Sequence, residues 1–176
     1  MRGTRRNLSK PSWQVLQAHA AAVHALLLRL TLRRDVADEL LHDLYVKLAT
    51  SGAVDKADNP GSYLRRAAIN LAMDWRRRRR IGPALPDVSA RMPDLGQALA
   101  DAEEVDRILN AAQELPELAR QAFALRFVQN ESYEDVGVAV GRSAHQARGL
   151  CHWAVSEIRL KLGIPRRRQV IHERVE

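Results

Sequence analysis

Arginine side chains supply most of the positive charge in this sequence, and seven of them form one group within residues 65–80. A second, smaller group consists of Arg142 and Arg148. A guanidinium can donate two parallel hydrogen bonds to a phosphate, and arginine and glutamine can each form paired bonds to a base edge. Gln146 accompanies the second group. These residue types indicate a protein that binds nucleic acid.

A second set of candidate residues is acidic and lies within residues 35–43. Acidic side chains near the start of a helix stabilise its positive end, which would explain Asp35, Asp38 and Glu39. Asp43 lies too far along for this, and it repels Glu39 four residues away by a few tenths of a kcal/mol. Two interpretations of this acidic face stay open: it is a docking surface for a basic partner, or it contacts only solvent. A metal centre is disfavoured, because no second cluster of ligands is evident.

The bulk composition fits an intracellular protein of helical class. The net charge is +7, and 46% of the residues are hydrophobic, mostly alanine and leucine, which favour helix over strand. Cys151 is the single cysteine, so an internal disulfide is excluded and a reducing cytoplasm is favoured. His19, His24 and Arg29 interrupt the N-terminal apolar stretch. We therefore expect no signal peptide, no membrane insertion and a cytoplasmic location.

The first half of the chain shows three helical patterns. Apolar residues recur from Trp13 to Leu30 at alternating steps of three and four, and a second pattern begins at Asp35. Asn59 and Pro60 mark the start of a third helix, as a capping side chain followed by a proline that needs no N–H donor there. We expect its buried stripe to consist of Leu64, Ala67, Ala68, Leu71 and Trp75.

The other side of this third helix is basic. The expected exposed stripe consists of Arg66, Asn70, Met73 and Arg77, flanked by Arg65, Asp74 and Arg76. An asparagine inside a basic stripe can bind unstacked bases as well as phosphates. The arginine run at 76–80 cannot all face one way, because successive helical residues turn by about 100°. A solvated helix end is the alternative interpretation.

Residues 81–96 interrupt the periodicity with glycines and prolines, which is typical of a linker. A helical pattern resumes near Asp101 and continues to about Leu162. The predicted fold class is all-α, with two small helical bundles joined by a flexible linker. The expected boundaries are 8–80 for the first bundle, 81–100 for the linker, 101–164 for the second bundle and 165–176 for a basic tail.

The second bundle contains a predicted helix-turn-helix. Ser132 and Ser143 are each followed three residues later by an acceptor side chain, which resembles two capping boxes. Gly141 lies between them, where a left-handed residue permits a reversal, and Gly137 is small enough for two helices to cross closely. The residues expected at the DNA surface are Arg142, Ser143, His145, Gln146, Arg148 and His152. An ordinary helical hairpin with a solvated face is the alternative.

Together these segments resemble the extracytoplasmic-function (ECF) sigma factors, a group of small two-domain bacterial transcription initiation factors. The resemblance spans residues 12–162 and is closest to the iron-uptake branch. The matching segments are Ala37–Tyr45, Tyr63–Arg77, Leu115–Glu117, Ala122–Phe127 and the helix-turn-helix. No one of these segments alone is specific to this family, but their combination in this order is.

The resemblance implies a sigma factor, without enzymatic activity, cofactor or small-molecule substrate, that directs core RNA polymerase to promoters. The residues implied to dock on the clamp helices of the polymerase beta-prime subunit are Asp38, Glu39, Leu40, His42 and Asp43. Those implied to capture the melted −10 element are Arg65, Arg66, Asn70, Asp74, Arg76 and Arg77. The helix-turn-helix would bind the −35 element. The beta flap of the polymerase and an anti-sigma factor are further implied partners.

Some residues depart from the family pattern. The order of Asp38 and Glu39 is the reverse of the usual one, and His42 replaces a glutamine. Gly149 and Leu150 stand where polar or basic residues are common, which leaves Arg142, Gln146 and Arg148 as the better candidates for base contact.

Two other classes of protein stay open. A stand-alone helix-turn-helix regulator would bind a palindromic operator as a dimer. A nuclease would use the carboxylates of Asp38, Glu39 and Asp43 to hold a metal ion, and would need ligands from a second element.

Overall fold

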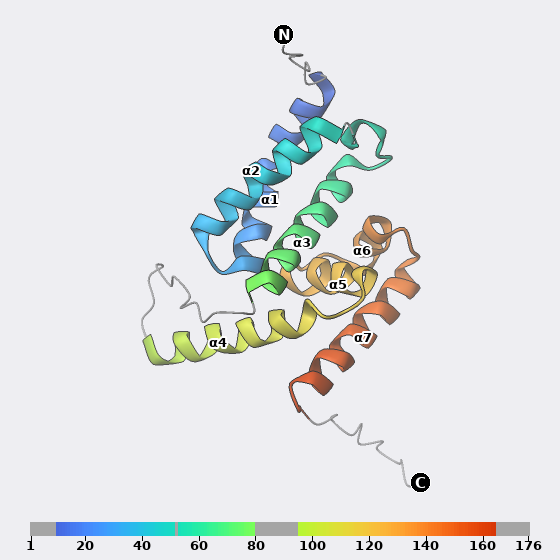
Figure 1. Ribbon diagram of the computed structural model, residues 1–176. Helices are drawn as coiled ribbons and strands as arrows, with labels where there is room; N and C mark the ends of the chain where they lie inside the picture. Colours follow the sequence, from blue (N-terminus) through green and yellow to red (C-terminus); the bar gives the residue numbers. More distant parts are fainter. Residues whose placement is uncertain (1–9, 52, 80–94, 165–176) are drawn as a thin grey trace, which may run out of the picture.

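The computed structural model describes residues 10–51, 53–79 and 95–164 (Figure 1). In chain order the elements are α1 (Lys10–Thr31), α2 (Arg34–Ser51), the 3-10 turn η1 (Val54–Lys56), α3 (Pro60–Arg79), α4 (Leu95–Ala112), α5 (Glu117–Phe123), the π-helical turn η2 (Ala124–Val128), α6 (Tyr133–Val140) and α7 (Ala144–Lys161). No strand occurs in the described ranges. The all-α prediction is confirmed.

Helices α1, α2 and α3 form the first bundle. The predicted apolar stripes are buried, with Leu27 and Leu30 of α1 at 0% exposure and Leu44 of α2 at 2%. Asn59 Oδ1 accepts a hydrogen bond from Ser62 N at 2.9 Å, and Pro60 is the first helical residue of α3. The predicted start of the third helix is therefore confirmed, with the cap satisfying one N–H of the first turn.

The burial of α3 differs from the prediction. Met73 was expected on the exposed stripe, yet it is fully buried, while Trp75 from the expected buried stripe is only half-buried. The reason is that α3 lies in the middle of the molecule, with α1 and α2 on one side and α5 and α6 on another (Figure 1). Its buried face consists of Ser62, Leu64, Ala68, Ile69, Ala72, Met73 and Arg76.

The linker expected over residues 81–100 is shorter at its C-terminal end, because α4 begins at Leu95 and includes Gly96. Leu, Gln and Ala at 97–100 are strong helix formers, so one glycine in the first turn does not stop the helix. The remainder of the linker and the basic tail lie outside the described residues.

The helix-turn-helix forms, with one of the two expected capping boxes. Ser132 caps α6 by accepting a hydrogen bond from Asp135 N, and Ser143 and Gln146 form a capping box at the start of α7. Gly141 adopts φ 67°, the left-handed conformation that lets the chain reverse. A Cβ on Gly137 would lie 2.7 Å from the carbonyl oxygen of Arg142, which confirms the close crossing of α6 and the turn.

The two bundles are in contact with each other. One continuous cluster of buried apolar residues includes Leu64 and Met73 from the first bundle and Leu109, Leu125 and Val136 from the second. A smaller cluster joins α4, α5 and α7. The two bundles therefore share part of one core.

Candidate nucleic-acid and protein interfaces

The N-terminal part of α7 is exposed, as a recognition helix requires. Arg142, Ser143, His145, Gln146 and Arg148 all face solvent, as does His152 one turn further on. Ala147 and Cys151 are buried on the opposite side and hold the helix on the bundle. A helix anchored in this way has one polar face free, which is the geometry that recognition helices use in the major groove.

Gln146 also caps the helix on which it lies. Its side-chain Oε1 accepts a hydrogen bond from Ser143 N at 3.1 Å, while Gln146 N donates to Ser143 Oγ at 3.2 Å. A paired contact to adenine needs both the amide oxygen and the amide nitrogen. The capping bond uses one of the two lone pairs of Oε1, so it fixes the orientation of the amide with which Gln146 would contact an adenine.

Tyr133 contacts Arg148, one of the predicted DNA-binding residues, and the sequence did not reveal this contact. The guanidinium of Arg148 lies 5.0 Å from the centre of its ring, and that of Arg126 lies 4.7 Å from the same centre. Cation–π contacts of this kind are worth about 0.5–1 kcal/mol at exposed sites. They hold Arg148 over the start of α6 without using its hydrogen-bond donors.

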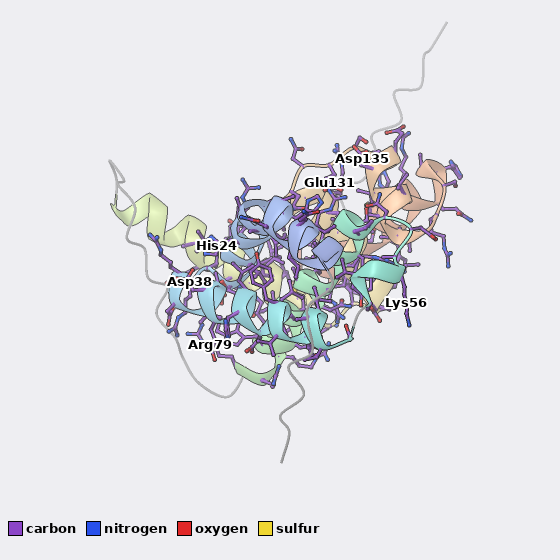
Figure 2. All side chains as sticks on the ribbon, turned by 90° about the horizontal axis from the view of Figure 1, so that it is seen from above. His24, Asp38, Lys56, Arg79, Glu131 and Asp135 are labelled. Atoms are coloured by element: carbon purple, nitrogen blue, oxygen red, sulfur yellow. The ribbon has the colours of Figure 1, made fainter. Side chains whose placement is uncertain are left out.

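The acidic face of α2 lies on the first bundle, whereas α7 belongs to the second. Asp38, Glu39, His42 and Asp43 are exposed, whereas Leu40 is 4% exposed and belongs to the core. Leu40 therefore supports the helix and does not belong to its accessible surface. Asp38 Oδ1 lies 2.7 Å from His24 Nε2 of α1, an ion pair when the histidine is protonated (Figure 2).

The basic face of α3 is turned toward the second bundle. Arg65 Nη1 lies 2.6 Å from Glu131 Oε1, and Asn70 Nδ2 donates to Glu117 Oε1 at 2.7 Å. Burial raises the pKa of the Glu131 carboxyl, and the positive charge of Arg65 opposes that shift. Residues predicted to contact melted DNA thus make polar contacts within the protein.

The other predicted residues of α3 divide between buried and accessible positions. Arg76 is 4% exposed and donates to Leu30 O, Asp106 Oδ1 and Asn110 Oδ1. The structure therefore buries Arg76, which was expected to flank an exposed stripe. Arg77 is exposed and pairs with Asp74 on the same helix at 3.3 Å. Arg66 lines a groove of about 470 Å³ between α3 and α5.

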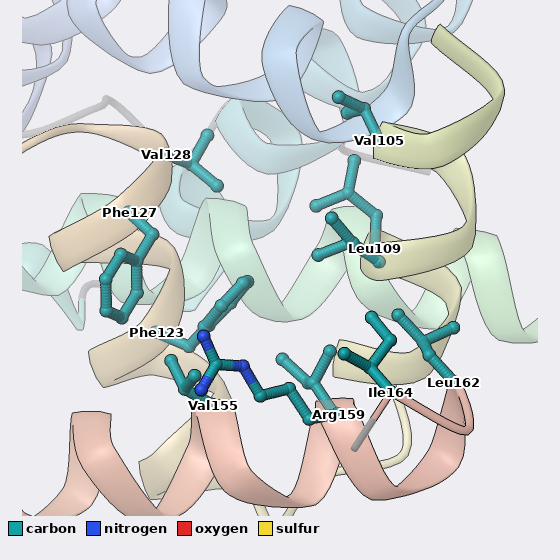
Figure 3. Close-up of a pocket in the computed structure, with 11 residues that line it drawn as sticks. Val105, Leu109, Phe123, Phe127, Val128, Val155, Arg159, Leu162 and Ile164 are labelled. Atoms are coloured by element: carbon teal, nitrogen blue, oxygen red, sulfur yellow. The ribbon is translucent and has the colours of Figure 1, made fainter. Parts of the chain in front are cut away.

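An apolar groove on the second bundle was not predicted. It has a volume of about 370 Å³ and lies between α4, α7 and the segment of α5 and η2 (Figure 3). Phe127 is 50% exposed and Val105 42% exposed at its rim. Arg159 is the one charged side chain among the described residues that line it. Such a lining suits apolar side chains of a protein and not a nucleic acid.

The described residues contain no cluster of three or more His, Cys, Asp or Glu side chains able to hold a metal ion. None of the helices in the described ranges is long and apolar enough to cross a membrane.

The fold and these surfaces define an all-helical protein with a helix-turn-helix in its second bundle and an acidic helix in its first. The chain is 28% identical over 156 residues to the ECF RNA polymerase sigma factor SigE of Mycolicibacterium smegmatis. That match covers 85% of this chain and 61% of the relative, so the chain spans about three fifths of the length of SigE. No protein-family model matches the chain.

Among solved structures, the chain is similar to the sigma factor RpoE from Bartonella quintana, which was co-crystallised with the anti-sigma factor NepR. The TM-score is 0.51 at 20% identity, covering 89% of this chain and 99% of RpoE. This similarity supports the fold, and the sequence similarity to SigE supports the ECF sigma factor family. Neither similarity distinguishes the iron-uptake branch.

Proposed function

We propose that this protein is an ECF sigma factor, which binds core RNA polymerase and directs it to specific promoters. The observation that carries the proposal is the exposed, capped helix α7 with Arg142 and Arg148 at its start, in a chain whose similarity to SigE covers both bundles. A cytoplasmic location follows from this role.

Two roles fall to surfaces that are accessible in the structure. In this proposal Asp38, Glu39, His42 and Asp43 of α2 dock on the beta-prime clamp helices, which fits their exposed carboxylates. The start of α7 binds the −35 element as duplex DNA, with arginine the favoured partner of guanine. An interface with the beta flap belongs to the same proposal.

The role of α3 is to hold the melted −10 element. Arg66 and Arg77 would contact its phosphates, and Asn70 would contact an unstacked base. The NepR complex of the similar RpoE supports a proposal that an anti-sigma factor also controls this chain.

Run-off transcription with purified core polymerase on a library of genomic fragments tests this function. We expect defined transcripts that require both the chain and the core enzyme, and weak DNA binding by the chain alone. A footprint on a palindromic site without polymerase would instead identify a dimeric regulator. DNA cleavage that a chelator abolishes, in the absence of polymerase, would identify a nuclease.

A further inference from the structure

Tyr133, the first residue of α6, contacts two guanidinium groups at once. The guanidinium carbon of Arg126 lies 4.7 Å from the centre of the Tyr133 ring, and that of Arg148 lies 5.0 Å from it. Arg126 belongs to η2 and Arg148 to α7, so the ring connects the segment before the helix-turn-helix with its second helix. We call these three residues the Tyr133 cluster.

The ring of Tyr133 is held in place by its surroundings. It is half-buried and packs against the larger of the two apolar clusters. Arg126 is also half-buried, and its Nη1 atom donates a hydrogen bond to the carbonyl oxygen of Glu131 at 2.6 Å. Glu131 lies in the loop that leads into α6, and Ser132 caps the first turn of that helix. The ring therefore has a fixed position on the second bundle.

The side chain of Arg148 is restricted mainly by this ring. It is exposed, and among the described residues none forms a hydrogen bond or an ion pair with it. An arginine side chain that is free on a helix surface samples many rotamers, and ordering it on binding costs conformational entropy. The contact with Tyr133 lowers that cost, because the side chain is already restricted before DNA binds.

The contact restricts Arg148 without occupying its hydrogen-bond donors. A cation–π interaction depends on the positive charge and the face of the ring, so the N–H groups of the guanidinium stay available. Two N–H groups held in one direction are what paired hydrogen bonds to O6 and N7 of guanine require. A phosphate can be bound by a point charge such as lysine and needs no such direction. The Tyr133 cluster therefore suits contact with a base.

We propose that Tyr133 is a positioning residue for base recognition: its ring holds the guanidinium of Arg148 in the direction that a guanine edge requires, and so sets the base preference at one position of the −35 element. The inference rests on the proposed function of α7. Tyr133 acts through Arg148 and needs no DNA contact of its own. Loss of the ring should thus affect the base position that Arg148 reads and leave the other positions unchanged.

Two substitutions of Tyr133 test this role. Tyr133→Leu removes the ring but keeps an apolar side chain against the core, and Tyr133→Phe is the matched control that keeps the ring. Each variant is combined with core polymerase, and run-off transcription is measured on promoters with each base at every −35 position. The change Tyr133→Leu in an Arg148→Ala background shows whether its effect passes through Arg148. Circular dichroism checks that the variants are folded.

We expect Tyr133→Leu to lower the preference at the Arg148-dependent position by about two- to fivefold, as the loss of one exposed cation–π contact would. Tyr133→Phe should keep the preference, and Tyr133→Leu should cause no further loss in the Arg148→Ala background. An equal loss at all positions would make Tyr133 a purely structural residue and overturn the inference. A loss at another position in the Arg148→Ala background would show that Tyr133 itself contacts DNA, which would also overturn it.

A measurement on the unsubstituted protein covers the case in which Tyr133→Leu does not fold. NMR relaxation of the side-chain Nε–H groups compares the mobility of Arg148 with that of Arg107, which is exposed on α4. We expect Arg148 to be the more ordered of the two, and equal mobility would overturn the positioning role. Absence of any polymerase-dependent transcript from the parent, with Arg148 ordered in this measurement, would instead overturn the proposed function and with it the use of the cluster in base recognition.

Discussion

Arg76 Nε of α3 donates a hydrogen bond to the carbonyl oxygen of Leu30, the penultimate residue of α1, at 2.5 Å. The same guanidinium bonds Asp106 and Asn110 of α4. Burial lowers the pKa of Arg76, and the carboxylate of Asp106 opposes that shift. One arginine therefore ties the end of α1 to α3 and to the second bundle.

The substitution Arg76→Ala should destabilise the fold. It leaves the carbonyl of Leu30 without this donor and removes an ion pair between a buried guanidinium and the half-exposed Asp106, for a loss of about 2–4 kcal/mol in the free energy of unfolding. Arg78→Ala is the control, because Arg78 is exposed and bonds only the backbone of its own helix among the described residues. Urea denaturation of both variants measures the difference, and equal midpoints would contradict a structural role for Arg76.

Gly137→Ala should disrupt the helix-turn-helix, because the new Cβ would meet the backbone oxygen of Arg142 at 2.7 Å. We expect a loss of about 1–3 kcal/mol. Gly149→Ala should have the opposite effect and stabilise by about 0.5–1 kcal/mol, since Gly149 is exposed within α7 and, apart from its own helix backbone, no described heavy atom lies within 4 Å of its Cβ position. Thermal unfolding followed by circular dichroism separates the two. Similar effects of both substitutions would argue against the close crossing.

The sequence reveals the features that depend on near neighbours. Asn59 with Pro60, Ser143 with Gln146, and Gly141 each act within a few residues, so their types alone indicate the helix start, the capping box and the reversal. The exposed face of α2 follows from periodicity in the same way. These predictions agree with the structure because local geometry decides them.

The contacts between the bundles are not visible to such reasoning. Arg65 and Glu131 are 66 residues apart, and no periodicity shows that they meet. For the same reason periodicity predicts only one buried face for α3, which puts Met73 and Arg76 at exposed positions. In the structure α3 packs on both bundles, and both residues are buried. Only a long-range signal, such as correlated substitutions in relatives, could have indicated the contact.

Cys151 should be unreactive in the folded protein. Burial raises the pKa of its thiol to about 11, and its Sγ lies 3.6 Å from Ala122 O. Because the thiolate is the reactive form and the native pKa lies above that of a free thiol, the thiolate fraction at pH 8 is far smaller in the folded state. We expect iodoacetamide to modify the protein only after unfolding in urea. Rapid labelling of the native chain would show that α7 opens readily.

Asp43→Arg should abolish binding to core polymerase while leaving helix content intact. Asp43 is exposed on α2, and its replacement also relieves repulsion by Glu39, so the helix itself gains a few tenths of a kcal/mol. Glu104→Arg gives the same change in charge on α4 and should bind normally. Affinity for labelled core enzyme, measured by fluorescence anisotropy, distinguishes the variants. Retained affinity in Asp43→Arg would remove α2 from the docking surface.

Arg148→Ala should weaken recognition of the −35 element by about 1–3 kcal/mol and relax the choice of base at one position. Arg148→Lys should not restore the preference, because a lysine lacks the paired donors that fit guanine. Arg159→Ala is the control, since Arg159 is exposed near the other end of α7. Run-off transcription on promoters with each base at every upstream position gives the measurement. A uniform loss across all bases would assign Arg148 to a phosphate, and no loss would exclude it from the interface.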